Sequence, residues 1–394
     1  MRVSQRGIAM PASPIRKLVP FAQQAKDRGV NVYHLNIGQP DIQTPRVFYD
    51  YIRKLFSSVV SYSPSDGIKE LKEAFSSYFG SWDIDISSDE LLVTSGGSEA
   101  IQFALAAVAD PGDDIMLIEP FYANYKGFAN ILGLNVRAAT SKVSNGYRLP
   151  NDEEMQQALT SKTRAILFSN PSNPTGVVYT EDELTRLIRF ARKNNLFVIS
   201  DEVYREIVFD GIKPSSIMTI DSGQDIIVVD SISKRFSSCG ARIGCVATKN
   251  KELYRTMMKF AQARLSPPTI AQFGTIGLLT LGKEYTDSVQ KEYEHRRDVV
   301  FEELSKIEGI EMQKPAGAFY ISVKLPVENA EEFVKWMLTD FSYNGSTVMV
   351  APLEGFYATE GIGTKEVRIA YVLSSEKMKA AIEILAKGIK GYGR

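Results

Sequence analysis

Residues 90–108, ELLVTSGGSEAIQFALAAV, hold the pattern that decides the fold. The segment opens with a short apolar run, passes through a glycine-rich turn and continues with apolar residues at helical spacing. A strand that leads directly into a helix is the repeating unit of α/β proteins. We therefore expect a strand, a tight turn and a helix here, and further units of the same kind along the chain.

The same alternation continues downstream. Residues 180–195 (TEDELTRLIRFARKNN) have a threonine cap, acidic residues in the first turn and basic residues in the last, which is typical of a helix. Apolar runs predict further strands: IMLIEP (115–120), RAILFSN (164–170), LFVISDE (196–202), DIIVVDS (225–231) and IGCVAT (243–248). This order predicts an α/β protein with a largely parallel sheet covered by helices.

The length of the chain predicts two domains. Its 394 residues exceed the roughly 250–300 that one hydrophobic core serves. A long charged helix pattern over residues 285–307 is placed to bridge them, and an α+β tail follows. We assign residues 46–290 to a large domain, and residues 1–45 and 291–394 to a small domain that includes the N-terminal arm.

Charge and hydropathy argue against several classes of protein. The 46 basic and 47 acidic residues give a net charge of -1, so the chain lacks the excess of positive charge that attracts nucleic acid or an anionic membrane. No window approaches the ~20 apolar residues of a membrane span, and the first residues lack the apolar core of a signal peptide. We expect a cytoplasmic protein that acts on small molecules, with no nucleic-acid or membrane partner.

The cysteines and histidines suggest no chemistry of their own. Cys239 and Cys245 lack the paired spacing of a zinc site and are too few for a disulfide framework, so we expect two small buried side chains. His34 and His295 lie in no context typical of a catalytic triad or a metal cluster. No metal is predicted, and acid–base chemistry is expected from other residues.

Residues 230–244, DSISKRFSSCGARIG, place Lys234 among small hydroxyl and glycine residues directly after an apolar strand. A lysine that forms an imine must be reachable and partly removed from water, and strand ends of α/β sheets are where such sites are built. Ser231, Ser233 and Arg242 are then close enough to hold a phosphate. A Ser-Lys pair alone is more typical of a solvated turn, so the interpretation depends on the other motifs.

Residues 94–100, TSGGSEA, are a candidate anion site. Gly97 and Ser98 lie where the strand gives way to the helix, so backbone N–H groups and the helix dipole favour an anion. The dinucleotide fingerprint needs a third glycine, and position 100 is alanine. One phosphate is favoured over two, and a turn without a ligand is the alternative.

Two more strand ends carry polar residues. FSNPSNPTG (168–176) contains two Asn-Pro steps, which favour extended geometry at each asparagine and suit a ring-binding site. In SDEVY (200–204), Asp201 ends a strand and Tyr204 follows three residues later. A carboxylate beside a pyridine nitrogen keeps the ring protonated and makes it an electron sink, whereas a helix N-cap is the structural alternative for Asp201.

Arg368 lies inside the apolar strand of KEVRIAYV (365–372), where an unpaired guanidinium would be costly to bury. Bidentate binding of a carboxylate is a typical role of arginine. A substrate carboxylate is therefore the functional interpretation, and an internal salt bridge is the alternative.

Together these segments resemble the class I aminotransferases of the fold type I pyridoxal 5′-phosphate (PLP) family, the aspartate aminotransferase superfamily. The resemblance covers nearly the whole chain, with the motifs in the same order and at similar spacing. It rests on LNIGQPDIQTP (35–45), YSPSDGIKELKEA (62–74), TSGGSEA (94–100), NPSNPTG (170–176), SDEVY (200–204), SISKRFSSCGARIG (231–244) and VRIAYV (367–372). It implies a large PLP-binding domain with a mostly parallel seven-stranded sheet, and a smaller α+β domain.

The resemblance implies roles for the matching residues. Lys234 would carry the cofactor as a Schiff base and move the substrate proton, and Asp201 would pair with the pyridine nitrogen. Asn173 and Tyr204 would hydrogen-bond the 3-oxygen of the ring, and Tyr122 would stack on its face. The activity implied is transfer of an amino group from an L-amino acid of aspartate, alanine or aromatic type to a 2-oxo acid such as 2-oxoglutarate.

The remaining roles concern anionic groups. Tyr62 is similar to a tyrosine that reaches the phosphate of the neighbouring subunit, which implies a homodimer with shared active sites. Gly38 and Arg368, with Asn173, would meet the substrate carboxylate. The phosphate would be held by Gly97, Ser98, Ser231 and Arg242.

The substrate side chain stays open. Aspartate-type members often carry lysine at the place of Ser98 to meet the side-chain carboxylate, and a serine lacks that charge. Arg16, Lys17 or Arg264 could compensate, yet each is equally well explained as a solvated surface charge. Aspartate, alanine and aromatic donors all remain.

Other functions fit the sequence less well. A lyase on the same fold, such as a C–S β-lyase, would use the same lysine and aspartate and is the main alternative. A PLP-sensing regulator would carry a DNA-binding domain, and no helix-turn-helix or basic extension precedes residue 30. A nicotinamide dehydrogenase would need the missing third glycine.

Overall fold

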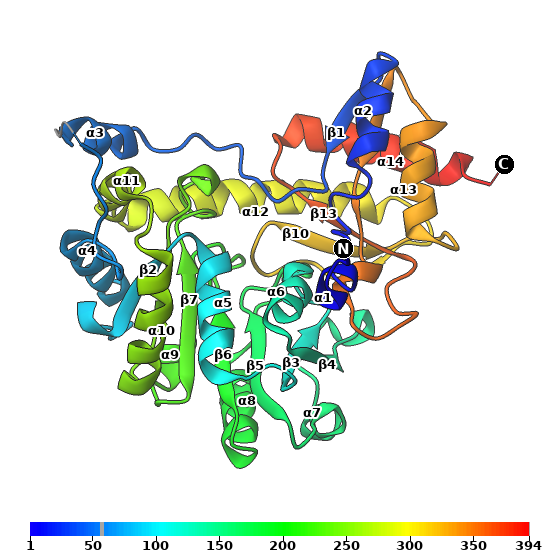
Figure 1. Ribbon diagram of the computed structural model, residues 1–394. Coiled ribbons are helices and arrows are strands. Elements are labelled where there is room, and N and C mark those ends of the chain that lie inside the picture. Colours follow the sequence, from blue (N-terminus) through cyan, green and yellow to red (C-terminus); the bar gives the residue numbers. More distant parts are fainter. Residues whose placement is uncertain (56–58, 394) are drawn as a thin grey trace.

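A seven-stranded sheet forms the centre of the computed structural model, which describes residues 1–55 and 59–393 (Figure 1). Strand β8 is antiparallel to both of its neighbours, and all other neighbouring strands are parallel. In spatial order the strands are β2 (Leu91–Thr94), β8 (Gly244–Ala247), β7 (Ile226–Ser231), β6 (Phe197–Asp201), β5 (Thr163–Ser169), β3 (Asp114–Glu119) and β4 (Asn135–Thr140). The predicted α/β class and the mostly parallel seven-stranded sheet are confirmed.

Both faces of this sheet are buried, which explains why its central strands are apolar throughout. Successive residues of a strand point to opposite faces, so in β6 Val198 packs into one core and Ile199 into the other. The Val198 face is covered by α4 (Lys69–Gly80), α7 (Asp152–Ala158), α8 (Glu181–Lys193), α9 (Ile217–Ile220) and α11 (Thr269–Leu279), and α3 (Arg46–Lys54) packs on α11. The Ile199 face is covered by α5 (Gly97–Val108), α6 (Asn124–Leu132) and α10 (Lys251–Arg264).

Helix α8 begins where the sequence predicts, and the reason is its capping box. The Glu183 backbone N–H donates to Thr180 Oγ1 (3.2 Å), and the Thr180 N–H donates to the Glu183 carboxylate (2.8 Å). Two backbone donors that the helix itself cannot satisfy are thereby paired.

A second core lies against an antiparallel sheet and a parallel strand pair. The antiparallel sheet has the order β12 (Ala351–Pro352), β13 (Glu366–Ala370), β10 (Tyr320–Lys324) and β9 (Glu311–Met312). The parallel pair is β1 (Asn31–His34) and β11 (Ser346–Met349). Helices α2 (Val19–Asp27), α13 (Ala330–Thr339) and α14 (Ser375–Gly391) cover these strands, and the short α1 (Gln5–Ile8) is exposed.

Helix α12 (Lys283–Ser305) connects the two regions, and Figure 1 shows it in yellow from the α11 side to the part that holds α13 and α14. Tyr285 packs against the core on the Val198 face and against the second core. The predicted boundary between residues 290 and 291 falls inside this continuous helix, and the division into two domains stays a prediction. Within the described residues, no helix is both long and apolar enough to cross a membrane.

Candidate active site

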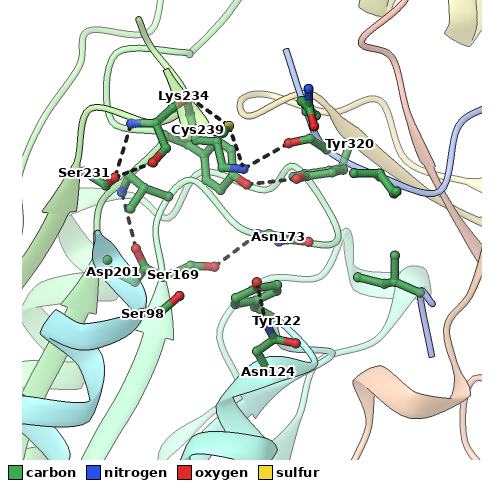
Figure 2. A pocket seen from close by; sticks show the side chains of 18 of the residues that line it. Ser98, Tyr122, Asn124, Ser169, Asn173, Asp201, Ser231, Lys234, Cys239 and Tyr320 are labelled. Atoms are coloured by element: carbon green, nitrogen blue, oxygen red, sulfur yellow. Dashed lines mark hydrogen bonds between the residues drawn. The ribbon is translucent and has the colours of Figure 1, made fainter. Parts of the chain in front are cut away.

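A cavity of about 250 Å³ lies at the carboxyl ends of the parallel strands, where α/β sheets commonly bind ligands. Figure 2 shows side chains from separate segments gathered around it. Nearly all of the predicted site residues line this cavity: Gly38, Gly97, Ser98, Tyr122, Asn173, Asp201, Tyr204, Ser231, Lys234, Arg242 and Arg368. Tyr62 does not line it, and 79% of its surface is exposed.

Lys234 lies in the turn that follows β7, with its amine in the cavity. Lys234 Nζ donates to the Gly38 carbonyl oxygen (2.9 Å) and lies 3.9 Å from Cys239 Sγ. Cys245 is buried as predicted, but Cys239 is only half-buried and lines the cavity, so its predicted burial is wrong. The short turn Cys239–Ala241 brings this thiol back beside the lysine.

One corner of the cavity is suited to an anion. The first N–H groups of α5, at Gly97 and Ser98, have no partners within the helix. Arg242 lies beside them and donates to the carbonyl oxygens of Ser95 (3.1 Å) and Cys239 (3.2 Å). Position 96 must be glycine, because its φ is +84° and a Cβ there would collide with the Arg242 guanidinium.

The hydroxyl groups of Ser231 and Ser233 complete this corner. They are 2.7 Å apart, and both side chains are buried on the cavity wall. The Arg242 cation, the two serine hydroxyl groups and the N-terminus of α5 therefore face the same space. Together they are a set of donors typical of phosphate-binding sites.

Asp201 ends β6 and is buried among neutral groups. The Tyr125 hydroxyl donates to Asp201 Oδ2 (2.6 Å), and the Val203 N–H donates to Oδ1 (3.4 Å). Burial raises the pKa of Asp201 to about 6, against the effect of these two hydrogen bonds. Residues 203–206 form a turn, so Asp201 does not cap a helix. Tyr125 was not predicted, because nothing in EPFYANY shows which tyrosine meets a residue 76 positions away.

The raised pKa of Asp201 predicts a pH dependence of stability. Between its usual pKa of 3.8 and about 6, the folded protein binds more protons than the unfolded chain. The free energy of unfolding, measured by urea titration without bound ligand, should therefore fall as the pH rises through this window. The loss should not exceed about 3 kcal/mol, since one pKa unit corresponds to about 1.4 kcal/mol. Asp201→Asn should remove this loss, and an unchanged pH slope in the variant would contradict the assignment.

Arg368 is 1% exposed and is held by neutral oxygens. Its Nη1 donates to Asn173 Oδ1 (2.8 Å) and its Nη2 to the Asn36 carbonyl oxygen (2.6 Å). The guanidinium lies 4.4 Å from the centre of the Tyr320 ring, and its Nε has no partner. Among the described residues no carboxylate pairs with Arg368, which contradicts the internal salt bridge.

Gly38 and Tyr204 meet at Tyr320, which the sequence did not single out. The hydroxyl groups of Tyr204 and Tyr320 are 2.9 Å apart, and burial raises the pKa of Tyr204 well above its usual value. A Cβ at position 38 would collide with the Tyr320 ring. Glycine at this position therefore allows the N-terminal segment to pass close to the aromatic wall of the cavity.

The three cations considered for the substrate side chain lie in different surroundings. Arg16 lines the cavity. Lys17 forms an ion pair with Glu331, and Arg264 forms one with Glu99 (3.1 Å), and neither lines the cavity. The structure thus brings only Arg16 to the site.

Four buried charged residues form a closed ring, which we call the charge ring: Arg205, Glu206, Asp230 and Arg235. A fifth buried carboxylate, Glu202, also lies 3.4 Å from Arg205. Arg205 binds Glu206 (2.8 Å) and Asp230 (3.1 Å), and Arg235 binds the same two carboxylates (2.7 and 2.6 Å). Each of these side chains is at most 1% exposed. The ring joins the segment that follows Asp201 to the segment that holds Lys234.

Comparisons with known proteins agree with this geometry. A family model described as "Aminotransferase class I and II" matches residues 30–385. Aspartate aminotransferase of Bacillus subtilis is 27% identical, and the match covers 100% of both chains. A crystal structure of aspartate aminotransferase from Thermotoga maritima superposes with a TM-score of 0.90 at 28% identity, covering 99% of this chain and 100% of that one. Alanine aminotransferase from Pyrococcus furiosus gives a TM-score of 0.89 at 29% identity, with 99% and 100% covered.

Proposed function

Because the chain belongs to the class I and II aminotransferases, we propose that the cavity around Lys234 is the site where an amino group passes from an L-amino acid to a 2-oxo acid. Enzymes of this family use PLP. The observation that supports this location best is that Lys234, Asp201 and Arg368 line one cavity from three separate segments.

The residues of the cavity fit PLP. Among the described residues no cation lies within 4.0 Å of the buried Asp201 carboxylate, and a protonated pyridine nitrogen would supply one. Tyr122, Asn173 and Tyr204 would contact the ring. The phosphate would be held by the anion corner of Gly97, Ser98, Ser231 and Arg242.

Bound PLP supplies an electron sink for the pair of electrons left when Cα loses its proton. Lys234 Nζ would take that proton from Cα and deliver it to the cofactor, and its position in the cavity makes it an effective base. Asp201 maintains a negative charge beside the ring nitrogen. Arg368 binds the substrate carboxylate, and its contacts with Asn173 and Asn36 fix the direction of the guanidinium.

An absorbance titration of the purified enzyme tests this function. Aspartate, alanine, tyrosine and glutamate are added in turn while the cofactor band is followed. Transamination converts the band stoichiometrically and releases the matching 2-oxo acid. A band that persists while pyruvate and ammonia form would indicate a β-lyase instead, and the absence of any cofactor band would overturn the proposal.

Arg368→Lys should lower kcat/KM about 100-fold for every amino donor. A lysine retains the positive charge but cannot present two parallel N–H groups to a carboxylate. The α-carboxylate is common to all donors, so the loss should be similar for alanine, aspartate and phenylalanine in steady-state assays. A loss confined to one donor would contradict the assignment.

We also propose a homodimer with shared active sites. Tyr62 is exposed and does not line the cavity of its own chain. Thr269 Oγ1 donates to the carbonyl oxygen of Ser61 (3.0 Å), which brings the residue before Tyr62 close to the residue before the exposed Ile270. Exposed apolar side chains close together are typical of an interface. The cytoplasmic location and the division into domains 46–290 and 1–45 with 291–394 remain predictions from the sequence.

A further inference from the structure

The cavity wall is strongly cationic. Its charged side chains are one carboxylate, Asp201, and four cations: Arg16, Lys234, Arg242 and Arg368. In the proposed function, Lys234 and Arg242 serve the cofactor and Arg368 serves the α-carboxylate. Arg16 is therefore a cation of the site that the common parts of the reaction do not use.

Arg16 also lacks a partner of its own. Within residues 1–55 and 59–393, no carboxylate lies within 4.0 Å of its guanidinium, and its side chain makes no hydrogen bond. Lys17, the next residue, is paired with Glu331 and lies off the cavity. Lys17 is thus paired outside the cavity, whereas Arg16 is an exposed side chain that is available to a ligand in the cavity.

The backbone that carries Arg16 is fixed to the site. Asn36 Nδ2 donates to the Ile15 carbonyl oxygen (3.1 Å), and the Asn36 carbonyl accepts from Arg368 (2.6 Å). One buried residue therefore links the arm directly to the arginine assigned to the α-carboxylate. On the other side, Pro14 packs tightly against Gly355.

Arg16 and Tyr122 line the same cavity. Ile15 packs against a small apolar cluster of Ala123, Leu353, Phe356 and Tyr357. Arg16 is close enough to Tyr122 for its charge to act on the pKa of that hydroxyl, which burial raises to about 12. The guanidinium thus belongs to the same part of the cavity as the aromatic ring assigned to the cofactor.

We propose that Arg16 binds the second carboxylate of a dicarboxylic substrate whose first carboxylate is bound by Arg368. The inference rests on the proposed function, and it selects four- and five-carbon dicarboxylic amino acids and 2-oxo acids over alanine-type and aromatic ones. A dicarboxylate supplies one anionic group for each arginine, whereas a monocarboxylic substrate leaves Arg16 without a partner. Ser98, which has no charge, is then not needed for this contact.

Single-turnover kinetics of the holoenzyme test the inference. The enzyme is mixed separately with glutamate, aspartate and alanine, and the rate of conversion of the cofactor band is measured for each. In Arg16→Gln, the ratio of the glutamate rate constant to the alanine rate constant should fall about 10- to 100-fold, as expected when a charge-assisted hydrogen bond is lost. Arg16→Lys should restore part of that ratio, and the matched control Lys17→Gln should leave it at the wild-type value.

The possible failures are distinguishable. If the wild type reacts with amino acids but the ratio is the same in Arg16→Gln, the subsite is wrong and the transaminase function stands. The same conclusion follows if the wild type prefers alanine to both dicarboxylic donors. If none of the added amino acids converts the cofactor band of the wild-type enzyme, the proposed function itself fails.

Discussion

Lys234→Ala is expected to lower kcat by about 10⁴-fold or more while leaving the fold intact. The variant loses the amine that is positioned to move the proton, and both general acid–base catalysis and positioning contribute large factors. It should also lose the absorbance band that depends on the lysine. Steady-state turnover and an absorbance spectrum of the same preparation measure the two effects together.

Two additional samples make this result specific. Lys213→Ala removes an exposed lysine outside the cavity and should retain wild-type turnover. A small primary amine added to Lys234→Ala should restore part of the rate, because it replaces the missing base. Turnover in Lys234→Ala within 10-fold of the wild type, a bound taken from the contribution of a general base, would exclude Lys234 as the base.

Arg235→Met should lower the free energy of unfolding by about 3–5 kcal/mol. The substitution leaves Asp230 and Glu206 with one arginine between them, in an interior where an uncompensated carboxylate is costly. The midpoint and slope of a urea titration, recorded by circular dichroism, give this free energy.

The chain offers a matched comparison for this variant. Arg192 also binds two carboxylates, Asp221 (2.7 Å) and Asp225 (2.9 Å), but its side chain is 43% exposed. Arg192→Met should therefore cost only about 0–1 kcal/mol, as for other surface ion pairs. Equal losses in the two variants would show that burial does not determine the strength of the charge ring.

The fold was predictable because its signals are local. Apolar runs, the glycine-rich turn after β2 and the capping box of α8 each lie within a few residues of the sequence. The carboxyl ends of parallel strands meet at one edge, so residues that follow those strands, such as Asp201 and Lys234, were expected together. The resemblance then supplied Gly38 and Tyr122, which no local rule indicates.

The rest of the site depends on contacts between distant parts of the chain. Tyr125 donates to Asp201, and Asn36 joins Ile15 to Arg368, yet none of these pairs has a sequence signal of its own. The expected burial of Cys239 is wrong, because the turn at Cys239–Ala241 brings its side chain back to the cavity, and no local sequence signal indicates this. Pairings of this kind are set by the packed fold.

The charge ring has a consequence for how this sequence can change over generations. Replacing Arg205 or Arg235 leaves buried carboxylates with too few counter-charges, so either single step is selected against. The charge balance of the interior is unchanged only when an arginine and a carboxylate are replaced together. Substitutions at the four positions therefore depend on one another, which limits the sequence changes that the segments carrying Asp201 and Lys234 can accept.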